Sequence, residues 1–142
     1  MPIVEVEHLA VTYGDVVAVD DVTFSADEGE ITVVLGPNGA GKTSTIECLE
    51  GYRKPTRGRA RVCGLDPISD HAELTRRIGV MLQAGGIPTA IRPAEVLRQY
   101  AAFYPSPRDP VELLGFVGLD HRAGAAYRTL SGGEQQRLSL AL

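Results

Sequence analysis

One stretch of eight residues has the residue types and spacing of a loop that binds phosphate groups. It matches the pattern G-x-x-x-x-G-K-[S/T] at every fixed position and consists of Gly36, Pro37, Asn38, Gly39, Ala40, Gly41, Lys42 and Thr43. The glycines let the backbone wrap around an anion, so that successive N–H groups point inward as donors. Lys42 would reach the β- and γ-phosphates of a nucleoside triphosphate, and the Thr43 hydroxyl would hold Mg²⁺. The loop therefore predicts nucleoside triphosphate binding.

The segments that flank this loop are those that it requires. Residues 31–35 (Ile-Thr-Val-Val-Leu) are a short apolar run that predicts a buried strand. Residues 44–49 contain no Pro or Gly and predict a helix, whose N-terminus would add partial positive charge beside the phosphates. A glycine-rich turn with an incidental lysine is the alternative, and the flanking strand and helix strongly disfavour it.

A second motif, Leu130-Ser131-Gly132-Gly133-Glu134, precedes an expected helix at residues 135–138. Ser131 and Glu134 alone would make a capping box, which is a purely structural alternative. A cap does not need the two intervening glycines, each of which costs about 1 kcal/mol against alanine within a helix. Gly132 and Gly133 make sense where the backbone must approach an anion closely.

The first thirty residues predict a small antiparallel sheet. Residues 3–7 alternate apolar and acidic side chains, and residues 11–13 and 16–19 flank a Gly-Asp turn as a hairpin would. Residues 22–25 continue this sheet. Residues 16–21 also resemble an apolar strand followed by a Mg²⁺-holding acid, but they precede the phosphate loop, where that element would follow it. We therefore favour the hairpin.

Further elements follow the loop. Residues 57–64 predict a strand with Arg57, Arg59 and Arg61 on one face, for which a solvated basic face is favoured over a contact with acidic lipid or a partner. A short helix is expected up to Arg77, and the apolar residues 78–82 predict a second buried strand that leads to Gln83. Two helices are expected next, one from Pro93 to about residue 104 and one from residue 110 to about residue 118.

Composition places the chain among ordinary globular proteins. Its 142 residues are 44% hydrophobic and 23% charged, enough for one domain with a core. We find no apolar run of the roughly 20 residues that a transmembrane helix needs, and no signal peptide at the N-terminus. The net charge of −4 argues against nucleic acid as a partner. The two cysteines, Cys48 and Cys63, are expected to be reduced thiols.

Four of these features together resemble one family. Tyr13, the phosphate loop, Gln83 and residues 130–134 occur in the order and approximate spacing of ATP-binding-cassette (ABC) nucleotide-binding domains. Residues 50–58 and 79–83 look like the drug- and antibiotic-exporter branch. The resemblance implies an α/β fold: an incomplete phosphate-loop core at residues 31–88, with an antiparallel β part at 1–30 and a helical subdomain at 89–142.

The resemblance also implies roles for individual residues. Tyr13 would stack on adenine, and the alternative is a core tyrosine of the hairpin. Gln83 would sense Mg²⁺ and the attacking water. Ser131 and Gly133 would contact the γ-phosphate of ATP on the opposite subunit of a homodimer or heterodimer, and Glu134 replaces the commoner glutamine.

The family further implies a location and a partner. ATP and Mg²⁺ would be the ligands, and a separate transmembrane permease subunit the partner, at the cytoplasmic, inner face of the plasma membrane. ATP binding and hydrolysis would drive export through that permease.

Some family elements are not found in the sequence. An apolar strand ending in Asp-Glu, which would help hold Mg²⁺ and supply the general base, does not occur after Lys42, nor does the switch histidine after Ser131. We therefore expect this chain to be poorly stable alone and to hydrolyse ATP negligibly. A truncated, non-catalytic nucleotide-binding or dimerisation module, or a gene remnant, is the alternative function. DNA-repair and translation-associated ABC proteins are disfavoured, since the chain has neither an inserted coiled coil nor a second cassette.

Overall fold

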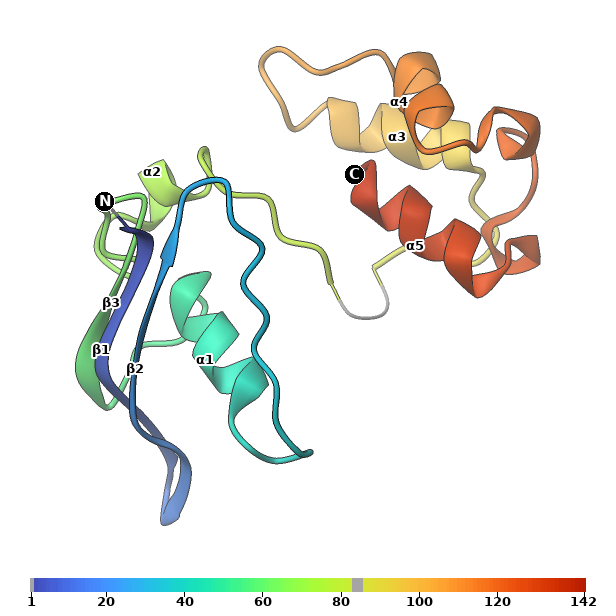
Figure 1. The fold of residues 1–142 in the computed structure, drawn as a ribbon. Helices are drawn as coiled ribbons and strands as arrows, with labels where there is room; N and C mark the ends of the chain where they lie inside the picture. Colours follow the sequence, from blue (N-terminus) through green and yellow to red (C-terminus); the bar gives the residue numbers. More distant parts are fainter. Residues whose placement is uncertain (1, 83–85) are drawn as a thin grey trace. The chain divides into compact units, whose positions relative to one another are not determined.

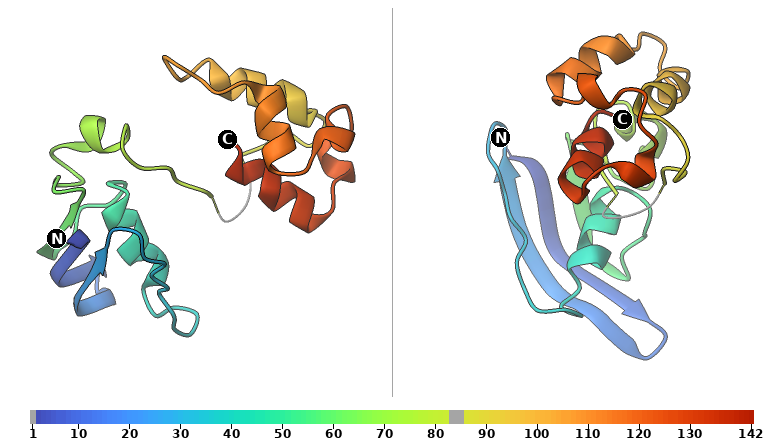
Figure 2. Two further views of the ribbon diagram at one scale, coloured as in Figure 1. Left: turned by 45° about the horizontal axis from the view of Figure 1, so that its top comes forward. Right: turned by 90° about the vertical axis from the view of Figure 1, so that its right-hand side faces the viewer.

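The structure, a computed structural model, describes residues 2–82 and 86–142 and divides the chain into two compact units. The first unit spans Met1–Val80 and the second spans Met81–Leu142. Figures 1 and 2 show a sheet with helices in the first unit and helices in the second. Each unit is described by itself below. Within the described residues, no helix has the length and apolar character that a membrane crossing demands.

A three-stranded sheet is the framework of the first unit. β1 (Pro2–Tyr13) pairs antiparallel with β2 (Val16–Asp27) on one side and with β3 (Arg57–Val62) on the other. The strand order is β2-β1-β3. The predicted hairpin is confirmed: Tyr13 pairs with Val16 across the turn, and the alternative Mg²⁺ strand at residues 16–21 is a long edge strand of this sheet.

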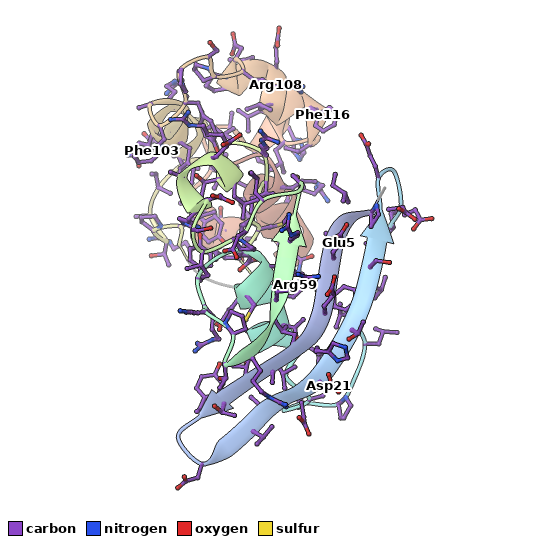
Figure 3. The ribbon with its side chains drawn as sticks, turned by 90° about the vertical axis from the view of Figure 1, so that its left-hand side faces the viewer. Glu5, Asp21, Arg59, Phe103, Arg108 and Phe116 are labelled. Atoms are coloured by element: carbon purple, nitrogen blue, oxygen red, sulfur yellow. The ribbon has the colours of Figure 1, made fainter. Side chains whose placement is uncertain are left out.

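The outer face of the sheet carries the charges that the sequence predicts. In β3, Ala60 and Val62 are buried while Arg57, Arg59 and Arg61 are exposed, because successive side chains point to opposite faces. Arg59 forms an ion pair with Glu7 of β1 at 2.7 Å. Figure 3 shows Glu5, Asp21 and Arg59, one on each strand. Such exposed pairs contribute little to stability, about 0–1 kcal/mol each.

The inner face of the sheet packs on helix α1 (Lys42–Leu49). Its buried side chains come from all three strands and the helix: Val6, Leu9, Val11, Val19, Cys48 and Ala60. A short helix, α2 (His71–Leu74), follows β3 and buries Leu74. It is shorter than predicted, since residues 75–77 form turns rather than helix. The apolar cluster holds α1 against the sheet through Cys48, near the end of the helix.

The two predicted buried strands are absent, and both predictions are wrong for this structure. Neither residues 31–35 nor residues 78–82 form a strand. Ile31 is 95% exposed and Leu35 is 85% exposed, while Met81 and Leu82 are exposed as well. A strand persists only when a neighbour accepts and donates its backbone hydrogen bonds. None of the described strands pairs with either segment.

The second unit is helical. It contains α3 (Pro93–Ala101), α4 (Pro110–Phe116), the 3₁₀ turns η1 (Asp120–Arg122) and η2 (Tyr127–Thr129), and α5 (Gly132–Leu140). Helix α4 begins as predicted: the Asp109 side chain accepts a hydrogen bond from the Val111 N–H at 2.7 Å, and proline occupies the first turn.

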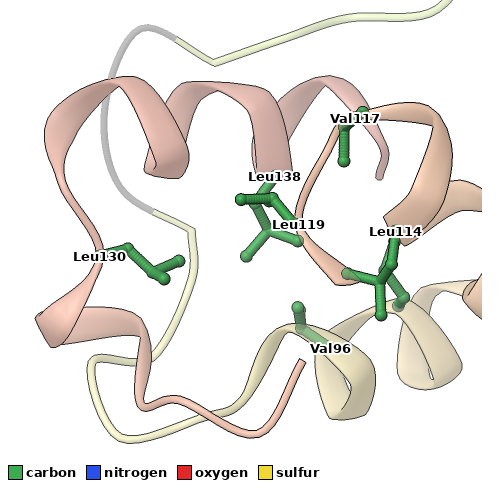
Figure 4. Close-up of a cluster of buried hydrophobic side chains, with 7 residues drawn as sticks. Val96, Leu114, Val117, Leu119, Leu130 and Leu138 are labelled. Carbon is green, nitrogen blue, oxygen red and sulfur yellow. The ribbon is translucent and has the colours of Figure 1, made fainter. Parts of the chain in front are cut away.

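A single apolar cluster holds these helices together. It comprises Val96, Leu97, Leu114, Val117, Leu119, Leu130 and Leu138, and Figure 4 shows these side chains converging from the three helices and from the segment between α4 and α5. Leu119 and Leu138 are fully buried. Val96 and Leu97 lie in α3. This helix ends at Ala101, earlier than the predicted end near residue 104, and Tyr104 lies beyond it and is exposed.

Candidate functional site

The phosphate loop is an exposed turn that ends in the N-terminus of α1. The Ala40 N–H donates to the Pro37 carbonyl at 3.2 Å, which closes a turn around Asn38 and Gly39. Gly39 has a φ of 84° and Gly41 a φ of 80°, a region that side chains with a Cβ rarely adopt. The loop therefore keeps the turn-and-helix geometry that its sequence predicts, although the expected strand before it does not form.

Gly41 is required for a second reason, because it is pressed against β2. A Cβ added at Gly41 would lie 2.2 Å from the Ala18 carbonyl oxygen and 2.6 Å from Cγ2 of Val19. By contrast, a Cβ at Gly39 would meet nothing within 4 Å. Gly41 is also the N-cap residue of α1. The close approach thus fixes the position of the helix N-terminus relative to the sheet.

The residues of the loop fit a Mg²⁺-bound triphosphate. The Lys42 ammonium folds back over the loop and donates to the carbonyls of Gly36 and Pro37, at 2.8 Å each. It is therefore already held above the turn where a phosphate would lie. Thr43, in the first turn of α1, is exposed and offers a hydroxyl oxygen, a ligand type that Mg²⁺ prefers. The helix N-terminus favours an anion at the same place.

Tyr13 is joined to the same helix. Its hydroxyl lies 2.9 Å from Oγ of Ser44, which is buried in the first turn of α1. The Arg53 guanidinium lies over the Tyr13 ring, 4.5 Å from its centroid. Tyr13 is nevertheless 43% exposed, so it is not a core residue of the hairpin. The ring is instead held at the surface, beside the helix that carries Lys42.

Arg53 is fixed in turn by Glu47 of α1. Its Nε donates to the Glu47 carboxylate at 2.6 Å, and its backbone N–H donates to the Glu47 carbonyl at 3.1 Å. The hydrogen bond to Glu47 raises the pKa of Arg53 above its usual value, with burial acting in the opposite direction. Sequence reasoning assigned no role to Ser44, Glu47 or Arg53, because their meaning depends on contacts with residue 13.

In the second unit, the Ser131 motif forms the N-terminus of α5. The Glu134 N–H donates to the Ser131 hydroxyl at 3.3 Å, and the Ser131 N–H donates to the Glu134 carboxylate at 2.7 Å. The capping box is therefore present, and Gly132 and Gly133 form the exposed first turn. The hydrogen bond from the Ser131 N–H is the main cause that holds the pKa of Glu134 below its usual value.

Arg122 braces this turn from η1. Its Nη2 donates to the Thr129 carbonyl at 2.7 Å, two residues before Ser131, and its Nε lies 3.4 Å from the Glu134 carboxylate. Arg137 donates to the Val117 carbonyl at 3.0 Å and ties α5 to the end of α4. The turn is thus rigidly attached to its own helical unit.

The expected site residues therefore fall into separate groups. Tyr13 and the phosphate loop come together in the first unit, while Ser131, Gly132, Gly133 and Glu134 form one turn in the second. Gln83, expected to sense Mg²⁺, lies outside the described residues.

Three comparisons relate the chain to known proteins. The family model described as "ABC transporter" matches residues 19–142. Among curated relatives, the chain is 36% identical to the Nod factor export ATP-binding protein I of Ralstonia nicotianae over 146 residues, covering 99% of this chain and 45% of that protein. It is 32% identical to the phosphonates import ATP-binding protein PhnC 1 of Natronomonas pharaonis, covering 96% of this chain and 61% of that protein.

Solved structures of ABC transporter subunits also resemble the chain. The ATP-binding subunit of an ABC transporter superposes with a TM-score of 0.81 at 26% identity, covering 98% of this chain and 60% of that one. CbiO1 from Clostridium perfringens, part of the complex cbiONQ, gives a TM-score of 0.83 at 24% identity and covers 60% of that chain, a likeness of fold alone. The chain spans a little under half the length of the Nod factor export proteins that it matches.

Proposed function

Because the chain belongs to the ABC transporter family, with a phosphate-loop α/β fold, we propose that its first unit binds ATP together with Mg²⁺. One observation carries this proposal. The Lys42 ammonium lies over an exposed turn at the N-terminus of α1, where the helix dipole and the cation favour the same anion. Bound Mg²⁺ would neutralise charge between the phosphates. Thr43 would be its protein ligand, together with Gln83.

The Ser131 turn would serve a second copy of the domain. Ser131, Gly132, Gly133 and Glu134 would meet the γ-phosphate of ATP held by another subunit, in a homodimer or heterodimer. This proposal is supported by a rigid, exposed helix N-terminus, a type of site that suits an anion. Tyr13 would hold the adenine.

In the intact protein, ATP binding and hydrolysis would drive transport through a separate transmembrane permease at the inner face of the membrane. Export is favoured by the names of the Nod factor relatives. For this chain alone we propose binding with negligible turnover, because no apolar strand ending in Asp-Glu follows Lys42 in its sequence. We also propose that the chain is divided as the family resemblance implies, into an antiparallel β part at 1–30, a phosphate-loop core at 31–88 and a helical subdomain at 89–142.

The experiment is equilibrium binding of Mg²⁺-ATP by titration calorimetry to the 142-residue chain and two variants. Lys42→Ala removes a charged donor, and we expect affinity to fall by about 10- to 150-fold, since such hydrogen bonds contribute about 1.5–3 kcal/mol. Lys54→Ala, at an exposed lysine in the same unit, is the matched control. Absent binding, or equal losses in both variants, would refute the proposal. Steady ATP turnover by the chain, abolished by Lys42→Ala, would instead refute the proposal that this chain alone has negligible turnover.

A further inference from the structure

We infer that Arg53 is a positioning residue for base recognition: it covers one face of the Tyr13 ring and leaves the other face for the base of the nucleotide. The inference rests on the proposed function, since it concerns the same nucleotide. Its geometric basis is the guanidinium carbon of Arg53 at 4.5 Å from the ring centroid. This is well within the distance of about 6 Å at which a cation and an aromatic face attract each other.

The ring is held at two points. Besides the stack with Arg53, its hydroxyl is bonded to Ser44 at 2.9 Å, so neither the tilt nor the direction of the ring is free. Ser44 lies two residues after Lys42 on the same helix. The Tyr13 ring is thus tied to the helix whose N-terminus ends the phosphate loop.

Arg53 is itself clamped rather than freely mobile. Glu47 holds the side chain by a 2.6 Å hydrogen bond and the backbone by a 3.1 Å hydrogen bond. Both side chains are about one-third exposed, which limits screening of their interaction by water. Arg53 is therefore ordered before the nucleotide arrives. Because it is already fixed, it loses little further freedom when a base stacks on the Tyr13 ring.

The exposure of Tyr13 indicates where the base would stack. With Arg53 on one face and the hydroxyl tethered, the Tyr13 residue is still 43% exposed. A ring sandwiched between two protein groups would not keep so much. Every base presents a π-face, so stacking on the Tyr13 ring contributes affinity without recognising the hydrogen-bonding edges of the base. ATP and GTP should therefore bind with similar affinity.

The test compares a ligand that has a base with one that does not. Titration calorimetry with Mg²⁺-ATP and with Mg²⁺-tripolyphosphate gives a ratio of dissociation constants for each variant. We expect Arg53→Ala to weaken ATP binding about three- to tenfold while tripolyphosphate affinity changes less than about twofold. Arg53→Lys keeps the cation and should recover part of the loss. Arg76→Ala, at an exposed arginine of the same unit, should leave both affinities unchanged.

A double-mutant cycle identifies the route of the effect. If Arg53 acts through Tyr13, Arg53→Ala should have no further effect on ATP affinity once Tyr13→Ala is present. Equal loss of ATP and tripolyphosphate affinity, or additive effects of the two substitutions, would overturn the inference while the proposed function stands. A wild-type chain that binds neither ligand would overturn the proposed function, and the inference with it.

Discussion

The two glycines of the phosphate loop allow a test in which one is the control for the other. Gly39 and Gly41 both have positive φ, at 84° and 80°, so alanine at either position carries a left-handed strain of about 1–2 kcal/mol. Only at Gly41 would the new methyl group overlap a neighbour, the Ala18 carbonyl oxygen at 2.2 Å. That oxygen belongs to β2, so relief requires the helix to move away from the sheet.

The size of the difference follows from this overlap. Forced overpacking typically adds about 1–3 kcal/mol, so we expect a loss of about 1–2 kcal/mol for Gly39→Ala and about 2–5 kcal/mol for Gly41→Ala. Native-state hydrogen exchange at β1 and β2 amides measures this loss in the first unit, separately from the second. Gly41→Ala should exchange about five- to 150-fold faster than Gly39→Ala. Equal exchange rates would refute the claim that contact with β2 makes Gly41 necessary.

Three further predictions concern the rest of the chain. Because hydrogen bonding lowers the pKa of Glu134, its carboxylate stabilises the helical unit above the unfolded-state pKa and loses this effect as pH falls through the folded-state pKa. Hydrogen exchange in α5 should therefore show wild type more stable than Glu134→Gln at neutral pH but not in strong acid; a pH-independent difference would contradict this. Burial raises the pKa of the Cys48 thiol, so alkylation at pH 8 should modify half-buried Cys63 first, and equal rates would be inconsistent with it. Leu138→Ala should lower the free energy of unfolding of the second unit by about 2–5 kcal/mol, measured by urea unfolding. Leu140→Ala, at an exposed position, should change the same free energy by less than about 0.5 kcal/mol.

The parts of the fold that the sequence predicted correctly are those fixed by near neighbours. The hairpin depends on a two-residue turn and on alternating side chains, and the α4 cap depends on Asp109 and the N–H two residues later. The Ser131 turn is equally local. Hydrogen bonds of this kind join residues that lie a few positions apart, so the local sequence suffices to predict them.

The apolar runs at 31–35 and 78–82 failed as predictions for the opposite reason. Their composition suits a strand buried on both faces, but a strand needs hydrogen-bonded neighbours, which no local pattern can guarantee. Arg53 was missed in a related way. Its contact with Tyr13 joins residues 40 positions apart, and the basic residue at 53 carries no signal of its own.

The capping box at Ser131 has a consequence for proton placement. The serine oxygen receives the Glu134 N–H through a lone pair, so the cap makes use of the hydroxyl only as an acceptor. The cap leaves the hydroxyl hydrogen unused, so it can rotate and donate to another acceptor, such as the phosphate proposed for this site. The structural and the phosphate-contacting interpretations of this motif are consequently compatible, because they use opposite ends of one O–H group. An aspartate at this position would keep the lone pair but lose the proton.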